Sequence, residues 1–202
     1  GLKGIPVLAT ATKKHSFFES LRAQDKAKVV HYVNFVTAIV KKRNPALLRA
    51  SDLSFLVVTE SFKAQVDPLF AAAVIAAESN FDAGARSHVG ARGLMQVMPP
   101  TGAFVSETAR FRWRGGSSLY DAQTNLQLGL QYIRSLFHQS KGDLNQVLMS
   151  YNWGPGNAQR FKQGRARMPE ETRRYMAKVM GLYKQWQLDF LNHKAKEALA
   201  LS

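Results

Sequence analysis

Residues 68–101 read PLFAAAVIAAESNFDAGARSHVGARGLMQVMPPT, and this stretch decides the fold. Its first half is rich in alanine and branched apolar residues, which predicts a buried helix that runs to Glu78 and ends near residues 80–84. Asp67 stands immediately before Pro68, and a capping carboxylate followed by a first-turn proline is a typical helix start. The second half carries three glycines and two consecutive prolines, which predicts turns or a small hairpin rather than a long helix.

The helical pattern extends to both sides of this stretch. Apolar residues recur every three or four positions over 16–43, as far as the Asn44-Pro45 breaker, and indicate one or two amphipathic helices. We expect further helices over 52–64 (capped by Ser51 or Asp52), from residue 101, over 121–139, over 144–153, and from 169 through 186 or beyond. No segment alternates apolar and polar residues as a half-buried strand does. The sequence therefore predicts an all-α fold with at most a short β-hairpin.

The charge balance indicates a polyanionic partner. The 202 residues include 28 Lys and Arg against 14 Asp and Glu, a formal net charge of +14. Nucleic acid, anionic lipid or an acidic wall polymer would each fit, and a merely solubilising surface is the alternative. Basic side chains gather in two places: Arg110, Arg112 and Arg114 interleave with aromatic residues, and a second group lies within 162–174. Either group could contact a polymer or simply face solvent.

Several kinds of site and segment are not expected. The chain has no cysteine, which excludes disulfides and thiolate-bound metals, and its five histidines lack ligand spacing, so we expect neither a metal site nor a cofactor. No apolar run approaches the ~20 residues of a membrane span. The first residues lack both a methionine and a signal-peptide pattern, so we expect that a targeting segment has been removed or that the chain begins within a longer protein.

Glu78 is the first candidate for chemistry. Phe70, Val74 and Ile75 precede it at helical spacing, so its face of the helix is largely apolar. Burial raises the pKa of a carboxyl, and a carboxylic acid that stays protonated near neutral pH can donate a proton to a leaving group. The residue alone leaves the alternative open that Glu78 is a solvated glutamate at a helix end.

Three motifs in order add weight to Glu78. The first is Glu78-Ser79-x-Phe81 with the downstream Gly90-Ala91-x-Gly93-Leu94-Met95-Gln96-x-Met98-Pro99-x-Thr101. The others are Tyr151-Asn152-x-Gly154-Pro155-Gly156 and Pro169-x-Glu171-Thr172-x-x-Tyr175. Together, over roughly residues 50–187, they resemble the signature of the soluble lytic transglycosylase catalytic domain, a family that shares the goose-type lysozyme fold. Trp153 departs from this resemblance, since the family usually has a small residue there.

The resemblance implies a single-acid mechanism. Glu78 would protonate the β-1,4 glycosidic oxygen between N-acetylmuramic acid and N-acetylglucosamine, and then deprotonate the muramyl 6-hydroxyl to close a 1,6-anhydro ring. Ser79 would bond near the acetamido group or the acid, and Tyr175 would lie close to Glu78. The residues that would line the sugar subsites are Met95, Gln96, Tyr151 and Asn152. From the residues alone, Ser79 could instead cap its helix, and Met95 and Tyr151 could fill the core.

The same resemblance organises the chain and its partners. Residues 1–45 would be an N-terminal arm and helical extension, 46–190 the lysozyme-like catalytic domain, and 191–202 a C-terminal helical tail. We expect a monomer that acts on peptidoglycan strands in the periplasm or cell envelope. We do not expect it to bind nucleic acid, and any membrane anchor would lie in a preceding segment. Two alternatives stay open: a goose-type lysozyme-like hydrolase that uses water, and a basic module that binds the wall or nucleic acid.

Overall fold

The computed structural model describes residues 17–200, with side chains described as far as residue 193. Its helices follow one another in the order α2 (Ala23–Arg43), α3 (Ala50–Ala64), α4 (Pro68–Glu78), α5 (Pro99–Thr108), the 3-10 helix η1 (Gly116–Tyr120), α6 (Ala122–Gln139), α7 (Leu144–Trp153), α8 (Pro155–Lys162) and α9 (Glu170–Ala200). Within the described residues there is no sheet, only isolated antiparallel bridges from Arg92 to Arg86 and to Val97. The predicted all-α class and the small hairpin-like turn are therefore confirmed.

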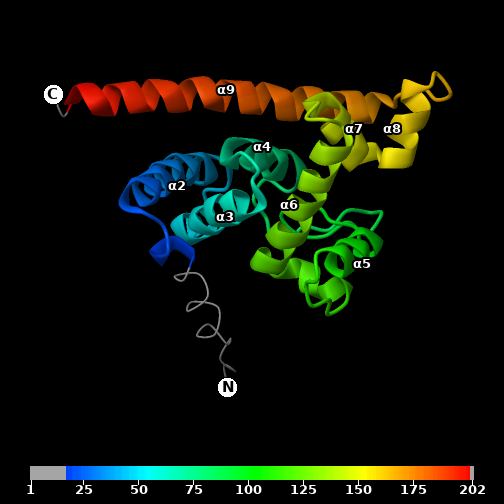
Figure 1. The fold of residues 1–202 in the computed structure, drawn as a ribbon, viewed down its shortest axis with the longest axis horizontal. Helices are drawn as coiled ribbons and strands as arrows, with labels where there is room; N and C mark the ends of the chain where they lie inside the picture. The colour runs from blue at the N-terminus through cyan, green and yellow to red at the C-terminus, as the bar shows by residue number, and fades with distance from the viewer. Residues whose placement is uncertain (1–16, 201–202) are drawn as a thin grey trace.

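The central element is α4, which lies under α9 and beside α3 (Figure 1). Its residues 68–76 are all buried, as expected for a run of alanine and branched apolar side chains. The predicted cap is present, because the Asp67 carboxylate accepts a hydrogen bond from the Leu69 N–H at 2.8 Å. The other carboxylate oxygen accepts from the Tyr183 hydroxyl of α9 at 2.9 Å. The start of α4 is thus fixed both to its own first turn and to the long C-terminal helix.

The structure differs from the prediction at the starts of two helices and contains one helix that was not expected. Helix α3 begins at Ala50 without a side-chain cap, so the expected cap by Ser51 or Asp52 is wrong; Asp52 instead forms an ion pair with Arg49 on the surface. Helix α5 begins at Pro99, two positions early, because proline suits the first helical turn. Helix α8 was not expected. Gly154 alone separates it from α7, and the new helix begins at Pro155.

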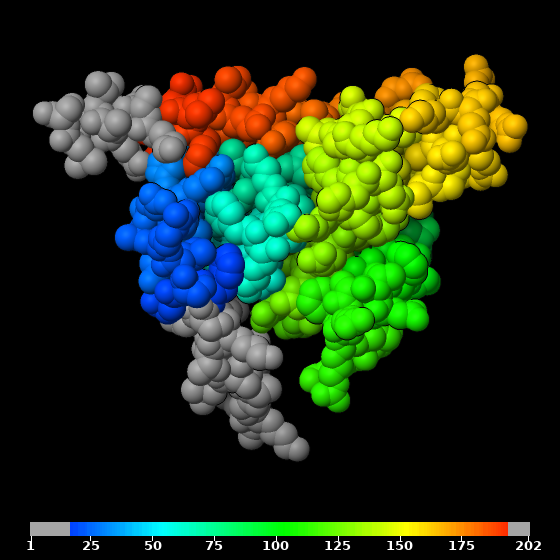
Figure 2. Space-filling model, in the orientation of Figure 1, coloured from blue at the N-terminus to red at the C-terminus, as the bar shows by residue number. Residues whose placement is uncertain are grey.

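The two ends of the described chain pack together. Helix α2 lies against α3 and α4, and α9 runs along the edge formed by α2, α4 and α7 (Figure 2). Phe190 of α9 stacks on Tyr32 of α2 with ring centroids 4.3 Å apart and meets Phe35 edge-on at 5.2 Å. An aromatic cluster therefore joins segments that are far apart in sequence.

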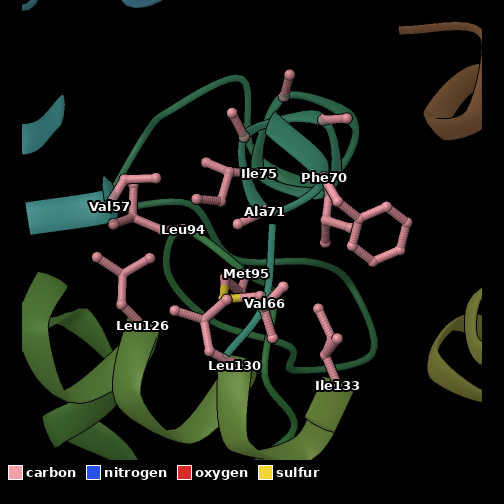
Figure 3. Close-up of a cluster of buried hydrophobic side chains, with 14 of the residues drawn as sticks. Val57, Val66, Phe70, Ala71, Ile75, Leu94, Met95, Leu126, Leu130 and Ile133 are labelled. Carbon is pink, nitrogen blue, oxygen red and sulfur yellow. The ribbon is translucent and has the colours of Figure 1, made fainter. Parts of the chain in front are cut away.

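Part of the core lies between α4 and α6, with the glycine-rich segment after α4 folded into it (Figure 3). Leu94 and Met95 of this segment are fully buried among side chains such as Ile75 of α4 and Leu130 of α6. Gly129 permits this packing, because a Cβ there would lie 2.5 Å from the Met95 sulfur. Among the helices that the structure describes, none has the length and apolar character needed to cross a bilayer.

Candidate functional site

Glu78 is the last residue of α4 and lies in a pocket of about 440 Å³. The pocket floor is the end of α4, residues 76–79. The loop wall consists of four residues from the segment after α4: Ala85, Arg86, Ser87 and Gln96. The helix wall consists of Arg43 of α2 and Lys178 of α9. Asn80 completes the lining. Glu78 is the one carboxyl among these residues, so the pocket joins a single acid to several cations.

The surroundings of Glu78 favour its protonated form. Burial raises the pKa of this carboxyl from 4.5 to about 7, although the Tyr175 hydroxyl and the Lys178 charge both act to lower it. The Tyr175 hydroxyl is buried and, among the described residues, has no partner in good hydrogen-bond geometry. It therefore influences Glu78 from nearby without forming a well-aligned bond to it. A carboxyl with a pKa near 7 can release and regain a proton at neutral pH.

Two tyrosines remain neutral beside this acid. Burial first, and then the nearby Glu78 charge, raise the pKa of Tyr151 and of Tyr175 well above 10. Both phenols therefore keep their protons and can act only as neutral hydrogen-bond partners. The Tyr151 hydroxyl donates to the Met95 carbonyl at 2.7 Å, which ties α7 to the segment after α4.

Ser79 and Gln96 line the pocket and also hold its shape. The Ser79 hydroxyl donates to the Leu94 carbonyl at 2.8 Å, so the helix end and the loop are joined next to Glu78. The Gln96 side-chain amide donates to the Gly93 carbonyl at 2.9 Å and the Ala85 carbonyl at 3.1 Å. Ser79 thus connects the floor of the pocket with the segment after α4, and Gln96 fixes that segment internally.

Asn125 of α6 anchors the same loop from below. Its amide oxygen accepts from the Met95 N–H, and its NH₂ group donates to the Arg92 and Leu119 carbonyls, each at 2.8 Å. Asn125 is fully buried and makes three of its bonds to backbone atoms. Asn125 therefore holds the loop wall in place. Periodicity alone would assign Asn125 only to the face of α6 that is turned toward the core.

Two of the expected subsite residues are placed differently. The Met95 side chain has no exposed surface and packs in the core (Figure 3), so it does not reach the pocket; only its backbone is tied to site residues. Asn152 is exposed at the end of α7 and is not part of the pocket lining. The structure brings together Glu78, Ser79 and Gln96 in the lining, with Tyr151 and Tyr175 close to the acid.

The helix wall was missed from the sequence. Arg43 ends a segment whose sequence matched no motif, and Lys178 lies one turn past the Tyr175 motif. The only signal was spacing, since Lys178 follows Tyr175 by three residues and so shares its helix face. No group of three or more His, Cys, Asp or Glu that could hold a metal is found in the part of the chain that the structure describes.

Comparison with known proteins places this geometry in a family. The profile of the transglycosylase SLT domain matches residues 56–173, more than half of the chain. The chain is 33% identical over 95 residues to a soluble lytic murein transglycosylase of Escherichia coli K12, and 35% identical over 98 residues to the membrane-bound lytic murein transglycosylase F of Desulfosudis oleivorans. Each alignment covers 46% of this chain but only 14% and 20% of those relatives, so the chain spans a small part of their length.

Solved structures agree with this placement at the level of the fold. The chain superposes on lytic transglycosylase Slt of Pseudomonas aeruginosa over 90% of its length and 33% of that protein, with a TM-score of 0.62 and 20% identity. The 70 kDa soluble lytic transglycosylase of Escherichia coli gives the same score and identity over 89% of this chain and 33% of its own. The helical, lysozyme-like architecture is thus shared, and with the profile match it establishes that the chain belongs to the transglycosylase SLT domain family.

Proposed function

We propose that this chain is a peptidoglycan lytic transglycosylase that cleaves the β-1,4 bond between N-acetylmuramic acid and N-acetylglucosamine. The observation that carries the proposal is Glu78, a single carboxyl at the floor of a pocket with a pKa near 7. At that pKa the acid is present in both protonation forms at neutral pH, which a group that must act first as acid and then as base requires.

The reaction balances around this one carboxyl. Protonated Glu78 gives its proton to the glycosidic oxygen as the bond from the muramyl C1 breaks, and the N-acetylglucosamine leaves with a free 4-hydroxyl. The muramyl acetamido group stabilises the positive charge that develops at C1. The muramyl 6-hydroxyl then bonds to C1, and the Glu78 carboxylate takes its proton, so the enzyme returns to its starting form. A tethered, well-oriented hydroxyl has a high effective molarity and reacts ahead of water.

The neighbours have supporting roles in this proposal. Tyr151 and Tyr175, kept neutral by burial, orient the acid and the sugar without adding a charge. Ser79 and Gln96 present polar side chains in the pocket lining, while Asn152 would contact sugar only beyond this pocket. A hydrolase would need a base to activate water, and the described lining has no second carboxyl, which favours the transglycosylase over a goose-type hydrolase.

We further infer that the protein works in the periplasm or cell envelope on peptidoglycan strands, as a monomer. Residues 46–190 would be the catalytic domain, preceded by an N-terminal arm and helical extension over 1–45 and followed by a C-terminal helical tail over 191–202. Envelope location is supported by relatives named soluble and membrane-bound lytic murein transglycosylases. The strong positive charge suits a polyanionic wall, and nucleic acid is not required to explain it.

Mass spectrometry of digested sacculi tests the reaction. We expect the wild-type chain to release muropeptides with 1,6-anhydro ends and no reducing muramyl ends, because no water enters the step. Glu78→Gln keeps the shape of the side chain but cannot donate a proton, and we expect at least a ~10³-fold lower rate. Reducing ends in the wild-type digest would show a hydrolase instead, and more than a few per cent activity in Glu78→Gln would refute the single acid.

A further inference from the structure

The pocket around Glu78 holds more positive charge than the proposed reaction uses. Arg43, Arg86 and Lys178 all line it, and Glu78 is the one carboxyl in its described lining. None of the three cations forms an ion pair with a carboxylate of the described residues. The glycan backbone of peptidoglycan is uncharged at the bond that is cut, so the sugars themselves offer these cations no partner.

Both cations of the helix wall are held in place without a counter-ion. The Lys178 ammonium donates a hydrogen bond to the Ala77 carbonyl at 3.0 Å, which fixes it at the end of α4. The Arg43 guanidinium lies over the Trp186 ring, 5.8 Å from its centroid. Donors that are already positioned lose less conformational entropy when they bind an anion. The helix wall therefore has the character of a prepared anion site.

The backbone around Arg43 is fixed to the turn that follows the acid. The Asn80 side-chain amide donates to the Arg43 carbonyl at 2.6 Å, and Asn80 and Phe81 both adopt left-handed backbone angles, with φ of 51° and 65°. The end of α2 is thus attached to the two residues that carry the chain out of the Glu78 helix. This attachment holds the Arg43 backbone next to the turn that follows Glu78.

We propose that Arg43 and Lys178 form a subsite for a carboxylate carried by the peptide stem of the muramyl residue being cut, with Arg86 of the loop wall adding to its positive charge. The stem is attached through the lactyl group of that sugar, so its carboxylates can approach the wall of the pocket that holds the sugar. Arginine and lysine donors to a carboxylate form strong charge-assisted hydrogen bonds. This inference rests on the proposed function, since it assigns the feature by which that same site selects its substrate.

The test compares matched glycan strands. One preparation carries peptide stems with free carboxylates, a second has the same stems amidated at those carboxylates, and each is assayed for kcat/KM of anhydro-product release. We expect the wild-type chain to prefer free carboxylates by roughly tenfold, the effect of one charged hydrogen bond. In Arg43→Gln and Lys178→Gln the ratio should fall toward one, and in Arg43→Lys, which keeps the charge, it should remain well above one.

A neighbouring lysine provides the control. Lys42 is exposed next to Arg43 and is not part of the pocket lining, so Lys42→Gln removes the same charge from α2 and should keep the wild-type ratio. A merely structural role for Arg43 would lower turnover of both substrates and leave their ratio unchanged, which would overturn the proposal. Equal rates of the wild-type chain on both substrates would overturn it as well.

Binding separates this inference from the reaction itself. The Glu78→Gln chain can be titrated with soluble stem-bearing glycan fragments, free or amidated, without turnover. Tighter binding of the free carboxylates, lost on adding Arg43→Gln, supports the subsite even if no anhydro product is ever found. Equal binding of both fragments refutes the subsite while leaving the proposed reaction intact.

Discussion

The loop wall and the helix wall of the Glu78 pocket are stabilised in different ways. The loop wall is held by neutral hydrogen bonds to backbone atoms, through Gln96 from within and Asn125 from below. The helix wall consists of two cations from α2 and α9, segments brought together by aromatic packing. The profile match over 56–173 contains the whole loop wall and neither residue of the helix wall. The family profile thus includes the loop wall with its one cation, Arg86, whereas both cations of the helix wall lie outside it.

This difference suggests that the two walls have different functions. A wall tied to backbone atoms cannot move without breaking several buried bonds, which suits the positioning of a reacting sugar. A wall of side-chain cations changes by single substitutions at little cost to the fold, which suits a choice among substrates. Substitutions in one part of the pocket at a time test this difference, and those in the loop segment should have the largest effects.

The loop wall should be the less tolerant of change. A Cβ at Gly93 would lie 2.3 Å from the Leu119 carbonyl oxygen and 2.4 Å from the Asn125 amide nitrogen, at a φ of +74°. Gly93→Ala should therefore lower the free energy of unfolding by about 4 kcal/mol, from overpacking and left-handed strain together. Gly90→Ala has a similar φ of +94° but nothing within 4 Å, so it should cost only about 1 kcal/mol. Urea denaturation compares the two, and equal losses would contradict a tightly packed loop.

The raised pKa of Glu78, in the floor between the walls, should make the stability of the folded chain depend on pH. The Glu78 pKa is near 7 in the folded chain and near 4.5 when unfolded, so the folded state binds this proton more tightly. The contribution of the Glu78 proton to stability should be fully present below pH 4.5 and be lost as the pH rises through 7. Glu78→Gln has no proton to lose and should be more stable than the wild type at pH 8, by roughly 3 kcal/mol. The two should converge at pH 4, and a constant difference across this range would refute the raised pKa.

The tie between α7 and the loop wall should have a moderate effect. Tyr151→Phe removes the hydroxyl that donates to the buried Met95 carbonyl at 2.7 Å, and leaving that carbonyl unpaired should cost about 1.5 kcal/mol. Tyr132, whose ring lies 5.6 Å from that of Tyr151, makes no such bond in the described structure. Tyr132→Phe is therefore the matched control, and thermal unfolding should show a clearly smaller loss.

The helices could be predicted from local signals in the sequence, whereas the site residues around Glu78 were predicted through the resemblance to the transglycosylase family. Alanine content and the Asp67-Pro68 start predicted α4, and the apolar face before Glu78 predicted a raised pKa, which agrees with the structure. Met95 was less predictable, since a methionine beside a polar motif can face a pocket or fill a core. The close approach of Gly129 decides between these, and it depends on how α6 packs.

The helix wall was unpredictable for a different physical reason. Arg43 and Asn80 are 37 positions apart and Lys178 and Ala77 are 101 apart, and no periodicity links residues at such distances. Arg43 and Lys178 reach the same pocket because α2 and α9 both pack on α4. A charge that ends an amphipathic helix is normally read as a solvated residue that complements the helix dipole. Only the packing of the helices places Arg43 in the same pocket as Glu78.

The smallest expected effect belongs to Lys178, which acts on the acid as well as on the proposed subsite. Its exposed ammonium lowers the Glu78 pKa, so Lys178→Met should raise that pKa and move the alkaline fall of activity to higher pH. Glycan strands whose stem carboxylates are all amidated isolate this effect, because they offer the subsite no free carboxylate. Screening by solvent keeps the shift small. Lys178→Arg keeps the charge and should leave the profile in place, as should Lys184→Met, which removes an exposed lysine of α9 outside the pocket lining. An unshifted profile in Lys178→Met would mean that the helix wall acts on the substrate alone, and the division between the two walls would then be complete.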